Sequence, residues 1–397
     1  MAQAPGDGSP PVTLHAIRGH EGARSALTRA HARGVLPAAL LFHGPRGIGK
    51  QRLALWLAQL LVCERPEQGP CGGCAPCRMA GSLEHPDVHW FFPLPRPKNA
   101  AGDKLVDALE EARMEELAAL RENPLRVPQS DEVRGLYVGT VRSIRAKAYK
   151  RPVMAPGQVF IIGDAEMLVP QEASPEAANA LLKMLEEPPG DCRFILTTSE
   201  SGHLPATIPS RTVPLHLAPL PTAEVEAFLV DVAGIEAKPA AWAAGLSQGS
   251  IGRALRFLPQ DDDTETLETR RRRALEIVVA AVGARASVGH ALAMSYPPAQ
   301  ARTLVELFAF VEEWLRDLAA VTAGARAAVI NGDSLAELDK LAAKGELTPW
   351  QLASAFGHVD SARDLALANV NPQLVIGSLI RNLRQSLARP HASEVTT

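Results

Sequence analysis

Short runs of apolar residues alternate with amphipathic segments from Leu14 to about Leu217. Continuous apolar runs of four to six residues suit strands of a parallel sheet that is covered on both faces. Helices are expected between the runs, for example at 51–62 and at 175–187, where two prolines follow and stop the helix. This order predicts an α/β domain. The predicted strands are 38–42 (AALLF), 158–163 (QVFIIG), 193–199 (RFILTTS) and 212–217 (TVPLHL).

Two segments interrupt this alternation. The first is rich in cysteine and spans 63–77, directly after the helix at 51–62. The second, 93–134, has prolines towards both ends and a charged helical pattern between them. We interpret 93–134 as a solvated excursion from the domain.

After Pro219 the strand patterns end, and every later segment has helical spacing. A small helical unit is followed by a hydrophilic linker and then by a longer all-helical region. The pattern therefore predicts three parts, with boundaries at 1–217, 218–272 and 273–397.

Composition adds little to this picture but excludes some classes of protein. With 46% hydrophobic and 21% charged residues, the 397-residue chain has enough apolar side chains for well-formed cores. The formal net charge of -3 is not that of a nucleic-acid-coating protein, although the basic segment 141–151 is a candidate local contact surface. No apolar run approaches the length of a membrane span, and the first residues have no signal-peptide pattern. We expect no membrane association and a cytoplasmic location.

The segment HGPRGIGKQ at 43–51 follows the first predicted strand and matches the phosphate-loop pattern G-x-x-x-x-G-K. In such loops, backbone N–H groups and the lysine bind phosphates, and a Ser or Thr hydroxyl after the lysine ligates Mg²⁺. Gln51 stands at that hydroxyl position. The pattern therefore predicts a phosphate loop without its metal ligand, and it leaves open whether nucleotide binding survives. The candidate nucleotide-binding residues are Gly44, Gly47, Gly49 and Lys50.

A second phosphate-site element is expected where the strand at 158–163 ends. An active site needs one carboxylate there for Mg²⁺ and another to orient the attacking water. The chain has Gly163, Asp164, Ala165 and Glu166 at this place, so one carboxylate is missing in either possible register. Compensation by Glu166 is the alternative.

Four of the five cysteines, Cys63, Cys71, Cys74 and Cys77, have the spacing C-x₇-C-x₂-C-x₂-C. In a reducing compartment such a group favours a metal over disulfides. Four thiolates form a closed tetrahedral Zn²⁺ shell, which is the pattern of a structural site. An iron–sulfur cluster and unligated thiols are the alternatives, because C-x₂-C-x₂-C also opens a ferredoxin pattern.

These segments, together with 175–189 (PEAANALLKMLEEPP) and 194–212 (FILTTSESGHLPATIPSRT), resemble the bacterial DNA polymerase III clamp-loader subunits. The resemblance extends from 19–27 to the helix at 371–383. Within this family the chain is most similar to the delta-prime subunits, which do not hydrolyse ATP and are related to the ATPase subunits gamma/tau. The resemblance implies an AAA+ ATPase-like domain with P-loop topology and a zinc insertion, then a helical lid and an all-α C-terminal collar.

The family pattern also assigns roles to single residues. Gly163 and Asp164 stand where active relatives have Asp-Glu. In the lid, active relatives have an arginine in G-S-x-R, whereas here Arg253 follows Gly249 and Ser250 one position too late. One residue turns a helical side chain by about 100°, so Arg253 is expected to miss the site. Arg211 stands in Ser-Arg-Thr where relatives have Ser-Arg-Cys, and the resemblance implies that it reaches the ATP of a neighbouring subunit as an arginine finger.

The resemblance therefore implies a non-hydrolysing subunit with structural zinc that assembles with gamma/tau and delta. The complex would load the sliding clamp on primed DNA. The alternatives are a catalytically active gamma/tau-like ATPase and a stand-alone zinc-dependent DNA-binding protein.

Overall fold

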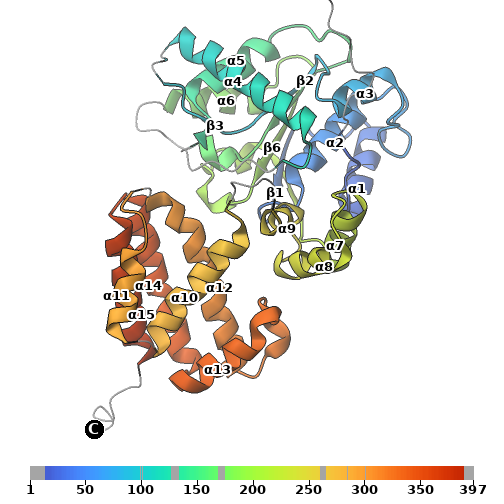
Figure 1. The fold of residues 1–397 in the computed structure, drawn as a ribbon. Helices are drawn as coiled ribbons and strands as arrows, with labels where there is room; N and C mark the ends of the chain where they lie inside the picture. Colours follow the sequence, from blue (N-terminus) through green and yellow to red (C-terminus); the bar gives the residue numbers. More distant parts are fainter. Residues whose placement is uncertain are drawn as a thin grey trace, which may run out of the picture. The chain divides into compact units, whose positions relative to one another are not determined.

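The computed structural model describes residues 14–98, 100, 102–126, 134–168, 175–259, 265–283, 285–299 and 301–388. The chain separates into two compact units, Met1–Leu255 and Arg256–Thr397 (Figure 1). Among the described residues, every strand falls in the first unit, and the second unit is helical.

A five-stranded sheet in the order β2-β5-β6-β1-β7 forms the centre of the first unit. All its neighbouring strands are parallel. The order places β1, which leads into the phosphate loop, between two strands that come much later in the sequence. The α/β fold class with P-loop topology is confirmed. The strands are β1 (Ala39–His43), β2 (Val88–Phe91), β5 (Val159–Ile162), β6 (Arg193–Thr198) and β7 (Val213–His216).

The two faces of the sheet are covered by different helices, as expected for strands that are apolar on both sides. Successive strand residues alternate between two buried clusters, so that Leu41 and Phe160 lie on one face while Leu40 and Ile161 lie on the other. Helices of the second half of the domain cover the first of these faces, and the two N-terminal helices cover the other (Figure 1). These helices are α5 (Val138–Ala148) and α6 (Pro175–Glu186) on one face, and α1 (Glu21–Ala32) and α2 (Lys50–Val62) on the other.

The four strands predicted from the apolar runs are confirmed, each to within a residue or two. The prediction missed β2, whose sequence VHWF is short and is interrupted by a histidine. It lies at the edge of the sheet, where it pairs with β5 alone, and three of its four side chains are only partly buried. An edge position needs no continuous apolar run, which explains the weak pattern.

The interpretation of 93–134 as a solvated excursion is wrong for the described residues. Its helix α4 (Asp103–Glu122) packs against α5 and contributes to a separate buried cluster. A short antiparallel ribbon of β3 (Leu94–Pro95) and β4 (Arg134–Gly135) joins the two ends of the segment. The members of the cluster include Phe92, Leu94, Leu105, Leu109, Leu117 and Tyr137.

Charged groups also attach α4 to the domain. Glu110 accepts hydrogen bonds from Arg113 and Ser143 and forms an ion pair with Lys147 of α5 at 3.0 Å. Burial alone would raise the pKa of Glu110, but Arg113 and Lys147 outweigh burial and lower this pKa to about 2. Part of the basic segment 141–151 therefore holds the insertion in place.

The buried face of α4 can be tested by truncation of one of its leucines. Leu109 is 3% exposed, and Leu109→Ala is expected to lower the free energy of unfolding by about 2–5 kcal/mol, because it opens a cavity. Met114 lies on the same helix and is 47% exposed, so Met114→Ala should change stability by less than about 0.5 kcal/mol. Urea unfolding followed by circular dichroism measures both. Equal, small effects would support the solvated excursion instead.

The segment predicted as a lid, 218–272, contributes α7 (Thr222–Asp231), α8 (Ala237–Leu246) and the start of α9 (Ile251–Phe257) to the first unit. The predicted boundary between residues 272 and 273 falls inside α10. The three-part division is finer than the two compact units and stays a prediction.

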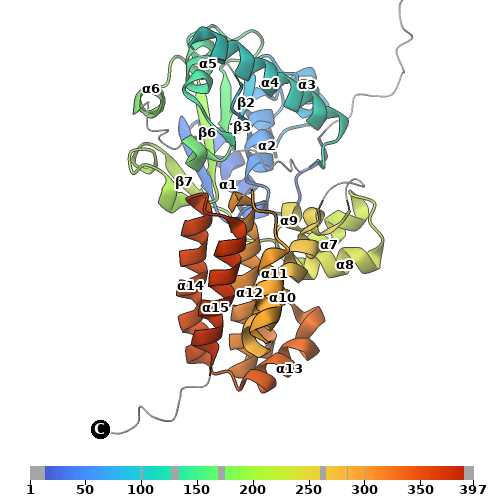
Figure 2. The same ribbon diagram turned by 60° about the vertical axis from the view of Figure 1, so that its left-hand side comes forward.

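The second unit is a bundle in which the long helices α12, α14 and α15 pack together (Figure 2). Its interior contains a buried cation: Arg271 is 1% exposed, pairs with Glu268 and Asp333, and lies over the ring of Trp314. None of the described helices is long and apolar enough to cross a membrane. The helices are α10 (Leu267–Gly283), α11 (Ala286–Met294), α12 (Leu304–Thr322), α13 (Leu335–Gly345), α14 (Pro349–Leu367) and α15 (Pro372–Leu387).

Candidate functional site

The phosphate loop lies between the end of β1 and the start of α2, at the carboxyl edge of the parallel sheet. Gly44, Gly47 and Gly49 all have positive φ, as the tight turn requires, and Gly49 is the N-cap of α2. Because α2 begins here, its unpaired backbone N–H groups and its dipole favour an anion at this place. The loop therefore has the backbone geometry of a phosphate site.

Lys50 points back into this loop and is held there by the protein itself. Its Nζ donates to the carbonyl oxygens of Gly44 at 2.8 Å and Pro45 at 2.7 Å, and to Ser199 Oγ at 2.9 Å. Burial lowers the pKa of Lys50 to about 8, although the charges of Asp164 and Glu166 oppose this shift. A phosphate that recruited Lys50 would have to replace these three acceptors.

Gln51 occupies the position of the missing hydroxyl, and both ends of its amide have partners. Its Oε1 accepts a hydrogen bond from the indole N–H of Trp90 at 3.0 Å. Its Nε2 donates to Asp164 Oδ2 at 3.2 Å. The oxygen, which is the only atom of this side chain that could ligate a metal, is thus already engaged by a donor.

The two carboxylates after β5, those of Asp164 and Glu166, have different hydrogen-bond partners. Asp164 has a φ of 49° and faces Gln51, whereas Glu166 accepts a hydrogen bond from the backbone N–H of Ser199 at 3.0 Å. The second oxygen of Glu166 is buried and has no hydrogen-bond partner among the described residues. The charge of Glu166 acts on Lys50, whereas the carboxylate that accepts a hydrogen bond from Gln51 is that of Asp164.

The start of α9 packs directly onto the phosphate loop. Ser250 Oγ donates to the carbonyl oxygen of Arg46 at 2.9 Å, and the Gly252 N–H donates to that of Gly47 at 3.0 Å. A Cβ at Gly47 would lie 2.4 Å from Ser250 Oγ, so this close approach depends on the glycine. The expectation that the Arg253 side chain misses the site stays a prediction.

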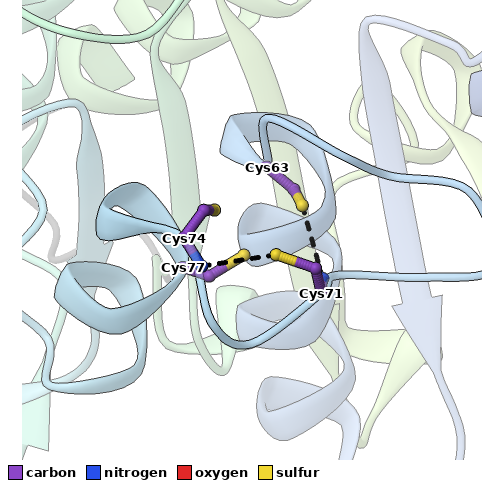
Figure 3. Close-up of side chains that lie close together, drawn as sticks. All are labelled: Cys63, Cys71, Cys74 and Cys77. Atoms are coloured by element: carbon purple, nitrogen blue, oxygen red, sulfur yellow. Dashed lines mark hydrogen bonds between the residues drawn. The ribbon is translucent and has the colours of Figure 1, made fainter.

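The four clustered cysteines converge around the end of α2 and the start of α3 (Ala75–Gly81), as Figure 3 shows. Cys63 follows α2 directly, Cys74 is the N-cap of α3, and Cys77 lies in its first turn. The four Sγ atoms all lie within 4.8 Å of one another. A tetrahedral site with Zn–S bonds of about 2.3 Å places sulfurs about 3.8 Å apart, so the four residues fit a closed four-thiolate metal site.

The pKa values of two of the thiols, Cys71 and Cys77, are shifted in opposite directions. Backbone N–H groups of Cys74 and Gly73 lower the pKa of Cys71 to about 6, whereas burial raises the pKa of Cys77. A divalent cation at the centre would favour the thiolate form of all four residues. Gln59 of α2 also donates to the Cys77 carbonyl oxygen at 2.9 Å, which anchors the module to the helix that begins at the phosphate loop.

Arg211 ends the short helix η3 (Pro209–Arg211) before β7 and is folded against its own chain. Its Nε donates to Glu186 Oε1 at 2.5 Å, and Nη2 contacts the same carboxylate. Its Nη1 donates to the carbonyl oxygen of Thr207 at 3.0 Å and to Ser210 Oγ at 3.1 Å. The side chain is 28% exposed, so it is accessible but not unpaired.

The predicted residues therefore form three separate groups: the phosphate loop, the cysteine cluster and Arg211. A family model described as "DNA polymerase III, delta subunit" matches residues 19–221, about half of the chain, and this range contains all three groups. The chain belongs to the DNA polymerase III clamp-loader family.

Relatives of this clamp-loader family member include two classes of subunit. It is 35% identical to DNA polymerase III subunit delta' of Pseudomonas aeruginosa over 187 residues. This matched segment covers 47% of this chain and 44% of that protein. It is 31% identical over 202 residues to subunit tau of Bacillus subtilis, covering 51% of this chain and 28% of that protein. The chain thus spans less than half the length of these two curated relatives. A solved gamma subunit-related protein of Thermotoga maritima is 14% identical with a TM-score of 0.42, covering 92% of this chain and 99% of that chain.

Three residues that contact these groups in this clamp-loader family member are not predicted from its sequence. Trp90 lies on the missed strand β2, and its contact with Gln51 joins residues 39 positions apart. Ser199 follows β6; its hydroxyl oxygen accepts a hydrogen bond from Lys50, and its backbone N–H donates one to Glu166. Glu186, the partner of Arg211, lies in the helix predicted at 175–187, but nothing in the sequence indicates which arginine it binds.

Proposed function

We propose that this chain is the non-hydrolysing, delta-prime-type subunit of a DNA polymerase III clamp loader. It assembles in the cytoplasm with gamma/tau and delta subunits, and the complex places the sliding clamp on primed DNA. ATP is hydrolysed by the neighbours, and Arg211 completes the ATP site of an adjacent gamma/tau subunit in trans. The four cysteines hold a structural Zn²⁺ ion.

The hydrogen-bonded chain from Trp90 through Gln51 to Asp164 carries the non-hydrolysing part of this proposal. Hydrolysis needs a metal ion between the loop and the nucleotide phosphates, and here the side chain at the metal-ligating position is engaged within the protein. The glycine at position 163 supports the same conclusion, because it leaves a single acidic residue, Asp164, next to Gln51.

A catalytically active gamma/tau-like ATPase is the second candidate. It is favoured by the retained Lys50, by the unpartnered buried oxygen of Glu166 and by the similarity to a tau subunit. In this alternative, Glu166 would compensate for the missing carboxylate.

Phosphate release by the isolated chain distinguishes the two candidates. We expect the purified chain to release phosphate from ATP no faster than its Lys50→Ala variant, with or without primed DNA, because Lys50 has no metal-bound nucleotide to act on. Turnover that Lys50→Ala abolishes would overturn the non-hydrolysing assignment.

Assembly is tested separately by gel filtration with purified gamma/tau and delta subunits. Co-elution as one complex is expected. A chain that stays monomeric and binds DNA tightly by itself would instead support a stand-alone zinc-dependent DNA-binding protein.

A further inference from the structure

The metal position beside the phosphate loop is filled by a protein group. A Mg²⁺ ion requires oxygen ligands at about 2.0–2.1 Å in octahedral geometry. Gln51 instead directs its amide nitrogen, with two N–H groups, towards Asp164 Oδ2. Trp90 fixes this orientation, because its N–H can pair only with the amide oxygen. The residues present do not fit a magnesium ion.

The Gln51 amide lies so close to Gly163 that it fills the space that a side chain at 163 would need. A Cβ at position 163 would lie 2.6 Å from Gln51 Oε1, 2.7 Å from Cδ and 2.8 Å from Nε2. Contacts shorter than 3.0 Å essentially never occur for a real Cβ, so any side chain at 163 would displace the amide. The amide is the end of a flexible side chain, so the cost of displacing it comes from its hydrogen bonds to Trp90 and Asp164, which it would lose.

We infer that Gln51 and Gly163 are a matched pair that replaces the magnesium site of this phosphate loop. The amide N–H group takes the place of the cation beside Asp164, and the absence of a side chain at 163 provides the space for it. A metal-binding residue at one of the two positions does not restore the site. An acidic residue at 163 would collide with the Gln51 amide, and a hydroxyl residue at 51 would still have Asp164 as its one neighbouring acidic group. This inference rests on the phosphate-loop site of the proposed function.

Thermal unfolding of the purified chain tests the steric part, with the variants Gly163→Ala, Gln51→Ala and the double variant. Gly163→Ala is expected to lower Tm by about 5 °C in the natural chain, because it displaces the buried Gln51 amide from its hydrogen bonds to Trp90 and Asp164. In the Gln51→Ala background the same change should lower Tm by less than half as much. The control is Gly202→Ala, because a Cβ at Gly202 meets nothing within 4 Å. Equal effects of Gly163→Ala in both backgrounds would overturn the pairing.

Electron paramagnetic resonance with Mn²⁺ as the probe tests the metal part. With ADP present, the natural chain should leave Mn²⁺ as free or ADP-bound ion, as its Lys50→Ala variant does. Protein-bound Mn²⁺ that disappears in Lys50→Ala would overturn the inference. The unfolding experiment needs no nucleotide and no partner subunit, and a Mn²⁺ site without turnover would leave the non-hydrolysing function intact, so the two proposals can fail separately.

Discussion

Arg211→Ala is expected to leave metal content, folding and assembly unchanged while it lowers the DNA-stimulated ATPase and the clamp loading of the reconstituted complex. A guanidinium neutralises charge that develops on the γ-phosphate in the transition state. Such fingers contribute on the order of 10³ to 10⁵ in rate at the site they complete. In the proposed complex the other ATP sites would keep their own arginine fingers, so bulk ATPase should fall only in part unless the sites act in concert.

Two variants of the same chain act as controls for Arg211→Ala. Arg33 is exposed on the first unit, and Arg33→Ala should change neither rate. Lys50→Ala in this chain should also change little, since its own loop is not expected to hydrolyse ATP. If Lys50→Ala abolishes loading and Arg211→Ala does not, then the working site lies in this chain and the proposed role of Arg211 is wrong.

Removal of the metal from the cysteine cluster is expected to lower Tm by about 10 °C or more, without change in any ATPase rate of the isolated chain. Binding of structural Zn²⁺ is itself folding free energy, about 10–16 kcal/mol in small zinc modules, and 1 kcal/mol shifts the Tm of a domain of this size by about 2–4 °C. A strong chelator followed by differential scanning calorimetry measures the shift, and inductively coupled plasma mass spectrometry should give one zinc per chain.

A comparison of two cysteines separates a metal site from buried thiols. Cys77 is buried and Cys71 is exposed. If both are ligands, Cys71→Ser and Cys77→Ser should lower Tm to a similar extent. An exposed thiol without a metal would contribute less than about 0.5 kcal/mol, so a silent Cys71→Ser would argue against a metal site. A visible absorption band after anaerobic purification would indicate an iron–sulfur cluster instead of zinc.

The sequence predicts most of the sheet and the elements of the phosphate loop, because β1, β5 and β6 have uninterrupted apolar runs that report burial directly. It does not predict β2 or the packed helix of the insertion. The strand β2 is short, lies at an edge and is interrupted by His89, whereas α4 has many polar residues and buries only one stripe of its surface. In such elements the apolar pattern is diluted, and tertiary packing determines which face is buried.

The same limit applies to the candidate site. Gln51 and Gly163 are recognised in the sequence as two separate departures from an active pattern. That they depend on each other follows only from the distance between them, and Trp90 enters through the strand that was missed. Likewise, the position of Arg211 is clear from the resemblance, whereas its pairing with Glu186 requires the fold to place the end of α6 beside η3.

This pairing changes what a neighbouring subunit would gain from Arg211. Nε, Nη1 and Nη2 all have acceptors in the free chain, so transfer of the guanidinium to a phosphate is an exchange of one anionic partner for another. The net contribution to the free energy of association is then that of the ion pair with the phosphate minus that of the lost ion pair with Glu186. An arginine in this arrangement adds little to the strength of subunit association, so its contribution would appear in the rate at the neighbouring site and not in the amount of complex formed.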